Sequence, residues 1–164
     1  MLSRLFTRRG FAGRVTSILP VLGVAGVGMG FSAQAPVGVQ KMDENGHLAS
    51  SKHMITPIIV HNGLIYISGQ GANDLGSVGS LDIETHTRKV LDNVKKLVEA
   101  GGGTMESILQ LTVYLATLAD YEAMNKVFRT YFPNGGPART TVAVAGVPGH
   151  SLLEINCIAA VVKS

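Results

Sequence analysis

Residues 137–154 of the chain read PARTTVAVAGVPGHSLLE, and the expected fold is built outward from this stretch. Residues 140–145 and 152–158 are rich in β-branched and aliphatic side chains, which favour β-strands. Gly146 and Pro148 lie between them and favour a turn. The stretch therefore predicts an antiparallel hairpin.

The expected hairpin brings two charged side chains together. With the turn centred near residues 147 and 148, Glu154 falls opposite Thr141, and Arg139 lies on the same face within diagonal reach. From charge and spacing alone, a structural ion pair between two strands is a commoner arrangement than a catalytic pair. Both interpretations stay open on these residues.

A second hairpin signal lies upstream, where Asn62-Gly63 separates residues 58–61 from residues 64–68. Asn and Gly tolerate the positive φ of a tight hairpin turn, so these two segments are expected to pair as antiparallel strands. The second of them ends in Ser68-Gly69-Gln70, and the glycine-rich residues 71–80 are expected as a loop.

Two amphipathic helices are expected between the hairpins. The first begins after Asp82, a good N-cap, and ends at the glycines from Gly101, and the second covers residues 120–132. Asn125 lies on the apolar stripe of the second helix, where a polar amide needs partners. The apolar face of the first helix comprises Ile83, Val90, Leu91, Val94, Leu97 and Val98.

A strand is expected between the helices, because Leu109, Leu111, Val113 and Leu115 alternate with polar residues. The order of elements predicts an α+β fold: a mixed sheet with both helices on one face. The other face of the sheet would be exposed in a monomer, so oligomerisation is expected.

Composition limits the classes of function. The 164 residues are 46% hydrophobic and 15% charged, as expected for one ordinary domain. From residue 36 onward, ten Lys and Arg face eleven Asp and Glu, which gives no support for nucleic-acid binding. No cofactor is expected. The scattered histidines are expected to be solvated loop residues rather than metal ligands, and Cys157, the single cysteine, to be a buried hydrophobe.

Residues 1–35 are predicted to be a targeting leader, followed by a linker and loop over residues 36–57. Arg8-Arg9 precedes an uncharged run that ends in Ala33-Gln34-Ala35, which resembles a twin-arginine export signal and predicts a periplasmic or secreted protein. A mitochondrial transit peptide and an uncleaved membrane anchor are the alternatives. After cleavage, no stable membrane association is expected.

Residues 58–162 contain a series of motifs in a fixed order: Ser68-Gly69-Gln70, VLDNVKKLVEAGGG, ILQLTVYL, YEAMNKVFRTYF and Pro137-Ala138-Arg139, followed by Leu153-Glu154-Ile155. In their order and spacing, these motifs resemble the reactive intermediate deaminase family of the RidA/YjgF type. It implies a chorismate-mutase-like homotrimer over residues 58–164, with active sites at subunit interfaces. It also implies hydrolysis of 2-imino acids, or their enamine tautomers, to 2-oxo acids and ammonia.

By this resemblance, Arg139 binds the substrate carboxylate, Glu154 acts on the hydrolytic water, and Ser68, Asn125 and Thr141 line the pocket. Many members of the family have cysteine at the position of Thr141. The chain has Ile55 where the family's deaminases usually carry a tyrosine, in the loop before the first strand. The alternative is therefore a non-catalytic trimer that binds small molecules or protects against stress. Ribonuclease and chorismate-mutase activities would need more positive charge than the chain provides.

Overall fold

The computed structural model describes residues 38–73, residue 75 and residues 82–162. The expected leader, and the expected loop over residues 71–80 apart from its first three residues and residue 75, lie outside the described residues. In the described part of the chain, no helix is both long and apolar enough to cross a membrane.

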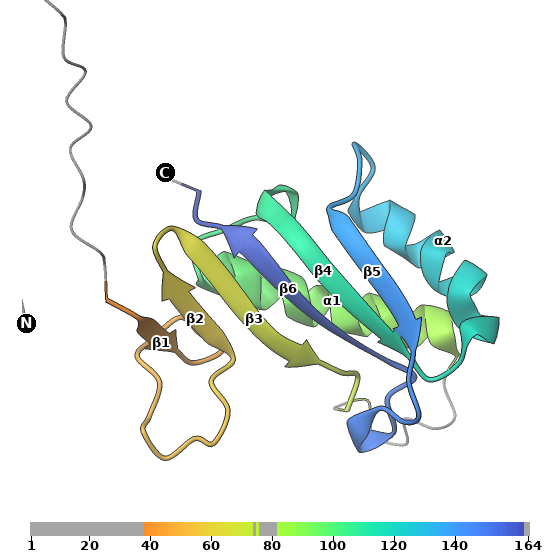
Figure 1. The fold of residues 1–164 in the computed structure, drawn as a ribbon, viewed down its shortest axis with the longest axis horizontal. Helices are drawn as coiled ribbons and strands as arrows, with labels where there is room; N and C mark the ends of the chain where they lie inside the picture. Colours follow the sequence, from red (N-terminus) through yellow and green to blue (C-terminus); the bar gives the residue numbers. More distant parts are fainter. Residues whose placement is uncertain (1–37, 74, 76–81, 163–164) are drawn as a thin grey trace, which may run out of the picture. The chain divides into compact units, whose positions relative to one another are not determined.

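A six-stranded sheet forms the centre of the fold (Figure 1). Its order is β1-β2-β3-β6-β4-β5, and β4 and β5 run parallel, whereas the other neighbouring strands run antiparallel. The expectation of a mixed sheet is confirmed. The strands are β1 (Gln40–Met42), β2 (Ile58–His61), β3 (Leu64–Gln70), β4 (Ile108–Leu115), β5 (Ala138–Ala143) and β6 (Leu153–Ala160).

The first expected hairpin is confirmed by the pairing of β2 with β3. Asn62 and Gly63 have φ of 50° and 77°, the positive values that a tight hairpin turn requires. A short strand, β1, pairs with the outer edge of β2, within the stretch expected as linker. Three residues are too few to show an alternating pattern, which is why the sequence gives no sign of this strand.

The second expected hairpin is wrong, because β4 lies between β5 and β6 (Figure 1). The helix that connects β4 to β5 returns the chain parallel to β4 and leaves β5 at the edge of the sheet. Residues 144–152 then cross the end of β4, so that β6 pairs with β3 on one side and β4 on the other.

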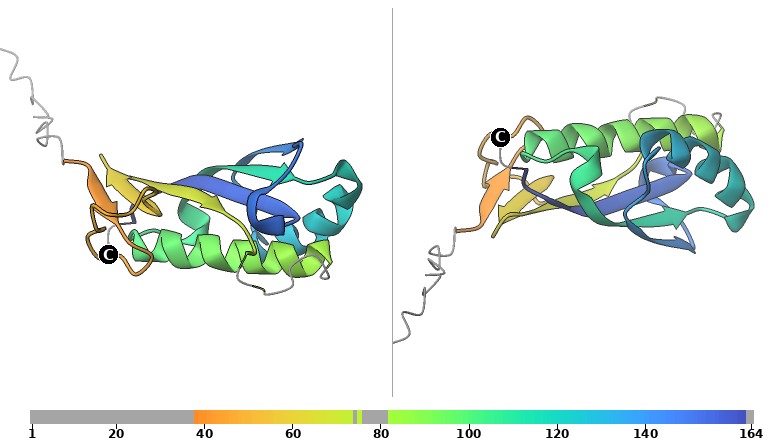
Figure 2. Two further views of the ribbon diagram at one scale, coloured as in Figure 1. Left: turned by 90° about the horizontal axis from the view of Figure 1, so that it is seen from below. Right: turned by 90° about the horizontal axis from the view of Figure 1, so that it is seen from above.

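Both helices cover the same face of the sheet, as expected (Figure 2). The carboxylate of Asp82 caps α1 by accepting a hydrogen bond from the Thr85 backbone N–H at 2.8 Å, and this bond lowers the pKa of Asp82. The helices are α1 (Ile83–Ala100) and α2 (Tyr121–Tyr131), with short 3₁₀ turns η2 (Met105–Ser107), η3 (Leu118–Asp120) and η4 (Pro148–His150).

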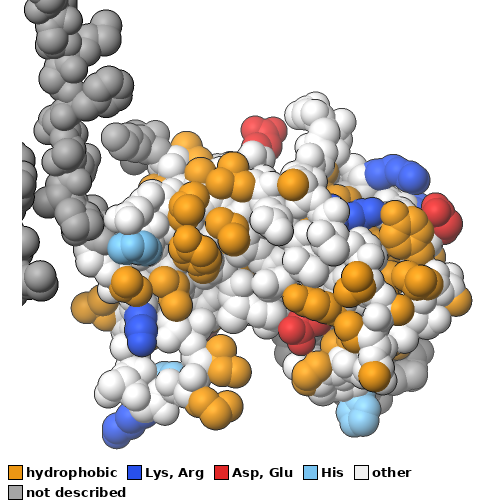
Figure 3. All heavy atoms as spheres, viewed as in Figure 1, with side chains coloured by type: hydrophobic (Ala, Val, Ile, Leu, Met, Phe, Trp, Pro, Cys, Tyr) orange, Lys and Arg blue, Asp and Glu red, His pale blue; other side chains and the backbone are white. Residues whose placement is uncertain are grey.

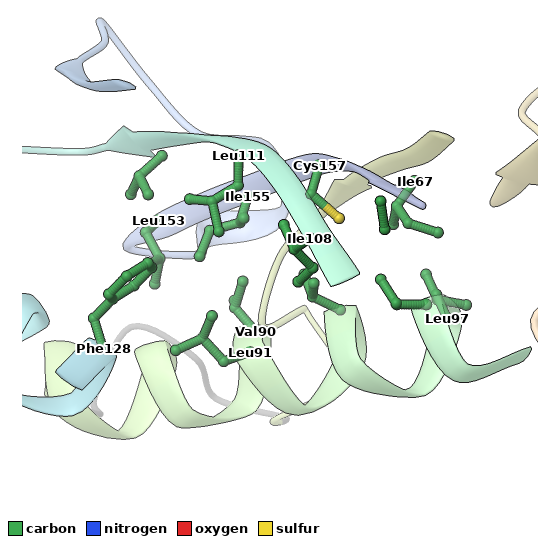
Figure 4. Packing of buried hydrophobic residues seen from close by; sticks show 14 of the residues in the cluster. Ile67, Val90, Leu91, Leu97, Ile108, Leu111, Phe128, Leu153, Ile155 and Cys157 are labelled. Carbon is green, nitrogen blue, oxygen red and sulfur yellow. The ribbon is translucent and has the colours of Figure 1, made fainter. Parts of the chain in front are cut away.

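The core fills the layer between the sheet and α1, where aliphatic side chains from the sheet meet those of the helix (Figure 4). All six apolar residues expected on one face of α1 are buried. One expected strand position is wrong: Leu109 is 51% exposed and Ile108 is buried instead, because the strand is irregular between Ile108 and Gln110. His86 is fully buried rather than solvated, and its Nδ1 accepts a hydrogen bond from the Leu152 backbone N–H at 3.0 Å.

The face of the sheet opposite the helices is uncovered. Tyr66 on β3 and Val142 on β5 are 39% and 40% exposed there, because they alternate with residues on the helix-covered face. Hydrophobic side chains recur across this face, with few charged ones over the strands (Figure 3). The expectation that two helices leave one sheet face open is confirmed.

Candidate functional site

Arg139 lies on the edge strand β5 and points toward α2. It is paired in register with the buried Leu111, which places it on the helix-covered face of the sheet. Its Nη2 donates a hydrogen bond to the Tyr121 hydroxyl at 3.3 Å, and its guanidinium carbon lies 4.6 Å from the centre of the Phe128 ring. Among the described residues, no carboxylate forms an ion pair with Arg139. The two aromatic side chains therefore position a cation that is available to an anion.

An open cleft of about 450 Å³ lies at Arg139, and Leu118, Tyr121 and Thr141 line it as well. Thr141 follows Arg139 by two residues on the same strand, so both side chains are on the same face. The Thr141 hydroxyl oxygen is buried and has no hydrogen-bond partner among the described residues. Because buried hydroxyl groups are normally paired, this oxygen is available to a water or a bound molecule in the cleft.

Glu154 lies on the opposite, uncovered face of the sheet. It is paired in register with Tyr114 on β4, and its carboxylate packs directly over Gly69 at the end of β3. A cavity of about 170 Å³ adjoins the Glu154 side chain. Its other lining residues are Tyr114, Val144, Gly146, Val147 and Pro148.

Ser68 immediately precedes Gly69, so it belongs to the end of β3 over which the Glu154 carboxylate packs. The Ser68 hydroxyl oxygen accepts a hydrogen bond from the Gln70 side-chain amide at 3.2 Å. The fold thus brings Ser68 close to Glu154 at the end of β3.

Asn125 is buried on α2, as its place on the apolar stripe indicates. It lies four residues after Tyr121 and three before Phe128, so all three side chains share one helix face. Tyr121 and Phe128 both contact Arg139. Asn125 therefore belongs to the Arg139 side of the molecule and not to the Glu154 side.

The expected placement of Arg139 and Glu154 on one sheet face is wrong. Arg139 pairs with Leu111 and Glu154 with Tyr114, and these two residues of β4 point to opposite faces. The cause is the insertion of β4 between the two strands, which changes the register on which the expectation depended. An ion pair between Arg139 and Glu154 within one chain is therefore excluded.

Sequence reasoning missed three residues that shape these two regions: Tyr121, Phe128 and Gly69. Tyr121 and Phe128 belong to a recognisable apolar stripe, but their contact with Arg139 depends on how α2 packs against β5. Gly69 belongs to the quoted Ser68-Gly69-Gln70 motif, yet its contact with Glu154 depends on the pairing of β3 with β6.

Cys157 does not take part in either region. Burial raises the pKa of its thiol to about 12, so the thiol is protonated at neutral pH and is a poor nucleophile. In the described ranges, no three His, Cys, Asp or Glu side chains gather closely enough to hold a metal ion.

The fold is that of a small α+β protein: a mixed sheet with two helices on one face. A cleft beside its edge strand holds Arg139, which has no carboxylate partner among the described residues. The sequence model of the family described as Endoribonuclease L-PSP matches residues 48–161. The chain belongs to this family, which includes the RidA/YjgF proteins, and the resemblance noted in the sequence is confirmed.

Three known proteins illustrate the similarity. Reactive Intermediate Deaminase A, chloroplastic, of Arabidopsis thaliana is 36% identical over 100 residues, or 60% of this chain and 54% of that protein, so the chain spans about half of its length. Protein mmf2, mitochondrial, of Schizosaccharomyces pombe is 36% identical over 101 residues, covering 60% of this chain and 80% of that protein. The crystal structure of a Rid family protein of unknown function from Yersinia pestis has a TM-score of 0.65 and 31% identity, covering 76% of this chain and 100% of that one.

Proposed function

We propose that the protein is a deaminase that hydrolyses 2-imino acids, and their enamine tautomers, to 2-oxo acids and ammonia. The observation that carries the proposal is Arg139: a half-buried cation, without a carboxylate partner among the described residues, in a cleft with an unpaired buried hydroxyl. Guanidinium binds a carboxylate through two parallel N–H donors and keeps its charge at any relevant pH. The name of the Arabidopsis relative supports the same activity.

Glu154 is the general base in this proposal. It accepts a proton from water as the water oxygen forms a bond to the imine carbon, and the C=N bond pair moves to nitrogen. The protonated Glu154 then returns this proton to nitrogen, which gives a carbinolamine. Glu154 next accepts the carbinolamine hydroxyl proton as the C=O bond forms and passes it to nitrogen, so the C–N bond breaks and ammonia leaves. Ser68 and Asn125 are proposed to line the pocket from the Glu154 side and the Arg139 side, respectively. The reaction consumes one water and needs no redox step.

We further propose that the protein is a homotrimer and that each active site forms between two copies. Arg139 and Glu154 lie on opposite faces of one sheet, so they reach the same small molecule only if different copies supply them. The uncovered sheet face carries exposed apolar side chains such as Tyr66 and Val142, which a neighbouring copy would bury. Both features support an interface site.

The decisive experiment follows imine loss directly. An amino-acid oxidase generates 2-imino acids in the cuvette, semicarbazide traps those that persist, and the purified protein is added at increasing concentration. The proposal predicts that the amount of trapped imine falls as the concentration of protein rises. Trapping that is independent of the protein would contradict deaminase activity.

A non-catalytic small-molecule-binding trimer is the second candidate, and one observation favours it. Ile55 is 62% exposed where deaminases of the family usually have tyrosine, so one phenol ring is missing from the expected pocket wall. This candidate predicts that the protein binds 2-oxo acids, measured by calorimetry, and leaves the lifetime of the imine unchanged in the trapping assay.

The name of the family contains a ribonuclease activity. The near-neutral charge of residues 36–164 does not favour RNA cleavage by this chain.

We propose export through the twin-arginine route for the leader, on the strength of Arg8-Arg9 ahead of an uncharged run. The relatives named as chloroplastic and mitochondrial support the organellar alternative. Replacing Arg8 and Arg9 with lysine distinguishes the two targeting routes. Twin-arginine export needs the arginine pair itself, whereas a transit peptide keeps its positive charge in this variant. Unchanged periplasmic yield of the variant in a bacterial host would rule the twin-arginine route out.

A further inference from the structure

The hydroxyl group of Tyr121 has a hydrogen that nothing in the described chain accepts. Its oxygen accepts a hydrogen bond from Arg139 Nη2 at 3.3 Å, and no other hydrogen bond of this hydroxyl is formed with the described residues. Arginine is a donor only, so the phenol is the acceptor in this bond and its own O–H remains available. The Tyr121 hydroxyl is thus a donor beside a cation.

The cleft places this donor where an anion would bind. Tyr121, Arg139 and Thr141 line the same space of about 450 Å³, and the Thr141 hydroxyl oxygen is buried there without a hydrogen-bond partner in the described part of the chain. A carboxylate has two oxygens with about four lone-pair sites, so it can accept hydrogen bonds from several donors at once. Three side chains from β5 and the start of α2 therefore surround one position suited to a carboxylate.

We propose that Tyr121 is a substrate-binding residue: its hydroxyl donates a hydrogen bond to the same carboxylate that the Arg139 guanidinium binds. The inference rests on the proposed function and adds to it a second donor on this side of the cleft. It also predicts which ligands bind, because a ligand must present a free carboxylate to use both groups. Esters and amides of 2-oxo acids lose the negative charge that Arg139 recognises, and they offer the Tyr121 hydroxyl only a neutral carbonyl oxygen, which is a weaker acceptor than a carboxylate.

Tyr121→Phe tests the hydroxyl separately from the ring. Phe keeps the aromatic face beside Arg139, and Phe128 at 4.6 Å continues to hold the guanidinium, so Arg139 should keep its position. Loss of a hydrogen bond to a charged group should weaken binding of 2-oxobutanoate, measured by calorimetry, by about ten- to a hundredfold. KM for the imino acid should rise with little change in kcat, because the carboxylate is the same in ground state and transition state.

Tyr131→Phe is the matched control, because it removes the same atom from the same helix. The Tyr131 hydroxyl donates to Asp92 at 2.7 Å, and this residue does not line the Arg139 cleft. Its loss should leave 2-oxobutanoate binding unchanged. The methyl ester of 2-oxobutanoate, which lacks the charge, should bind the parent and Tyr121→Phe equally weakly.

The outcomes separate this inference from the proposed function. If Tyr121→Phe binds 2-oxobutanoate as the parent does while Arg139→Lys binds it weakly, the Tyr121 hydroxyl is not a ligand donor and the carboxylate role of Arg139 stands. If neither variant changes binding, the assignment of the cleft as the carboxylate site is wrong, and the inference is wrong with it. Circular dichroism and light scattering confirm that each variant folds and assembles as the parent does.

Discussion

Gly69→Ala should abolish most of the proposed imine hydrolysis without unfolding the protein, because the new methyl group would occupy the place of the Glu154 carboxylate. A Cβ built at Gly69 lies 2.7 Å from Glu154 Cδ and 3.2 Å from its Cγ, and it overlaps Oε1. Carbon atoms in contact stay about 3.5–4.0 Å apart, so the carboxyl carbon must move by roughly 1 Å. Misplacement of a reacting group by that distance costs about a hundredfold in rate.

The backbone itself accepts alanine at this position. Gly69 is not among the residues with positive φ, so the substitution adds no backbone strain and removes freedom from the unfolded chain. We therefore expect a nearly unchanged Tm alongside a fall of about a hundredfold in kcat/KM for imine hydrolysis. Gly38→Ala is the matched control, because its Cβ would meet no atom within 4 Å. Wild-type kcat/KM in Gly69→Ala would refute the argument that the position of Glu154 over β3 matters for catalysis.

Three further predictions address the site, the assembly and the thiol. Arg139→Lys and Glu154→Gln should each slow imine hydrolysis by about a hundredfold or more while the trimer persists, and parent rates in both variants would remove these residues from the mechanism. Light scattering should give the mass of a trimer at micromolar concentration; a monomer would contradict an interface site. Cys157 should react with Ellman's reagent at pH 8 about a thousandfold more slowly than an ordinary thiol of pKa 9, because burial raises its pKa to about 12, and fast labelling of the native protein would contradict that burial.

The sequence predicts the type and order of the main elements, and their local chemistry explains why. Asn62-Gly63 tolerates the positive φ that a tight hairpin turn requires, and Asp82 offers a capping carboxylate to the helix that follows it. Each therefore marks the boundary of an element without help from distant residues. Likewise, the burial of Asn125 follows from its place on a helical stripe. These features depend only on residues within a few positions of one another.

The partners of each strand could not be predicted in the same way. Alternation in residues 140–145 and 152–158 shows which side chains share a face of each strand, but it does not show which strand lies beside it. The placement of β4 between β5 and β6 depends on the crossover through α2, and it reverses the expected relation between Arg139 and Glu154. The contacts of Tyr121 with Arg139 and of Gly69 with Glu154 also depend on how distant elements pack, so the sequence alone did not predict them.

The central position of β6 has a consequence during translation. β6 is the last strand of the described chain, yet it lies between β3 and β4, so neither can complete its pairing until residues 153–160 have left the ribosome. The nascent chain therefore exposes residues 1–35, the proposed leader, long before the sheet can close. A translocase that threads unfolded polypeptide could engage the leader in that interval, whereas a pathway that carries folded cargo must wait until the final strand is in place.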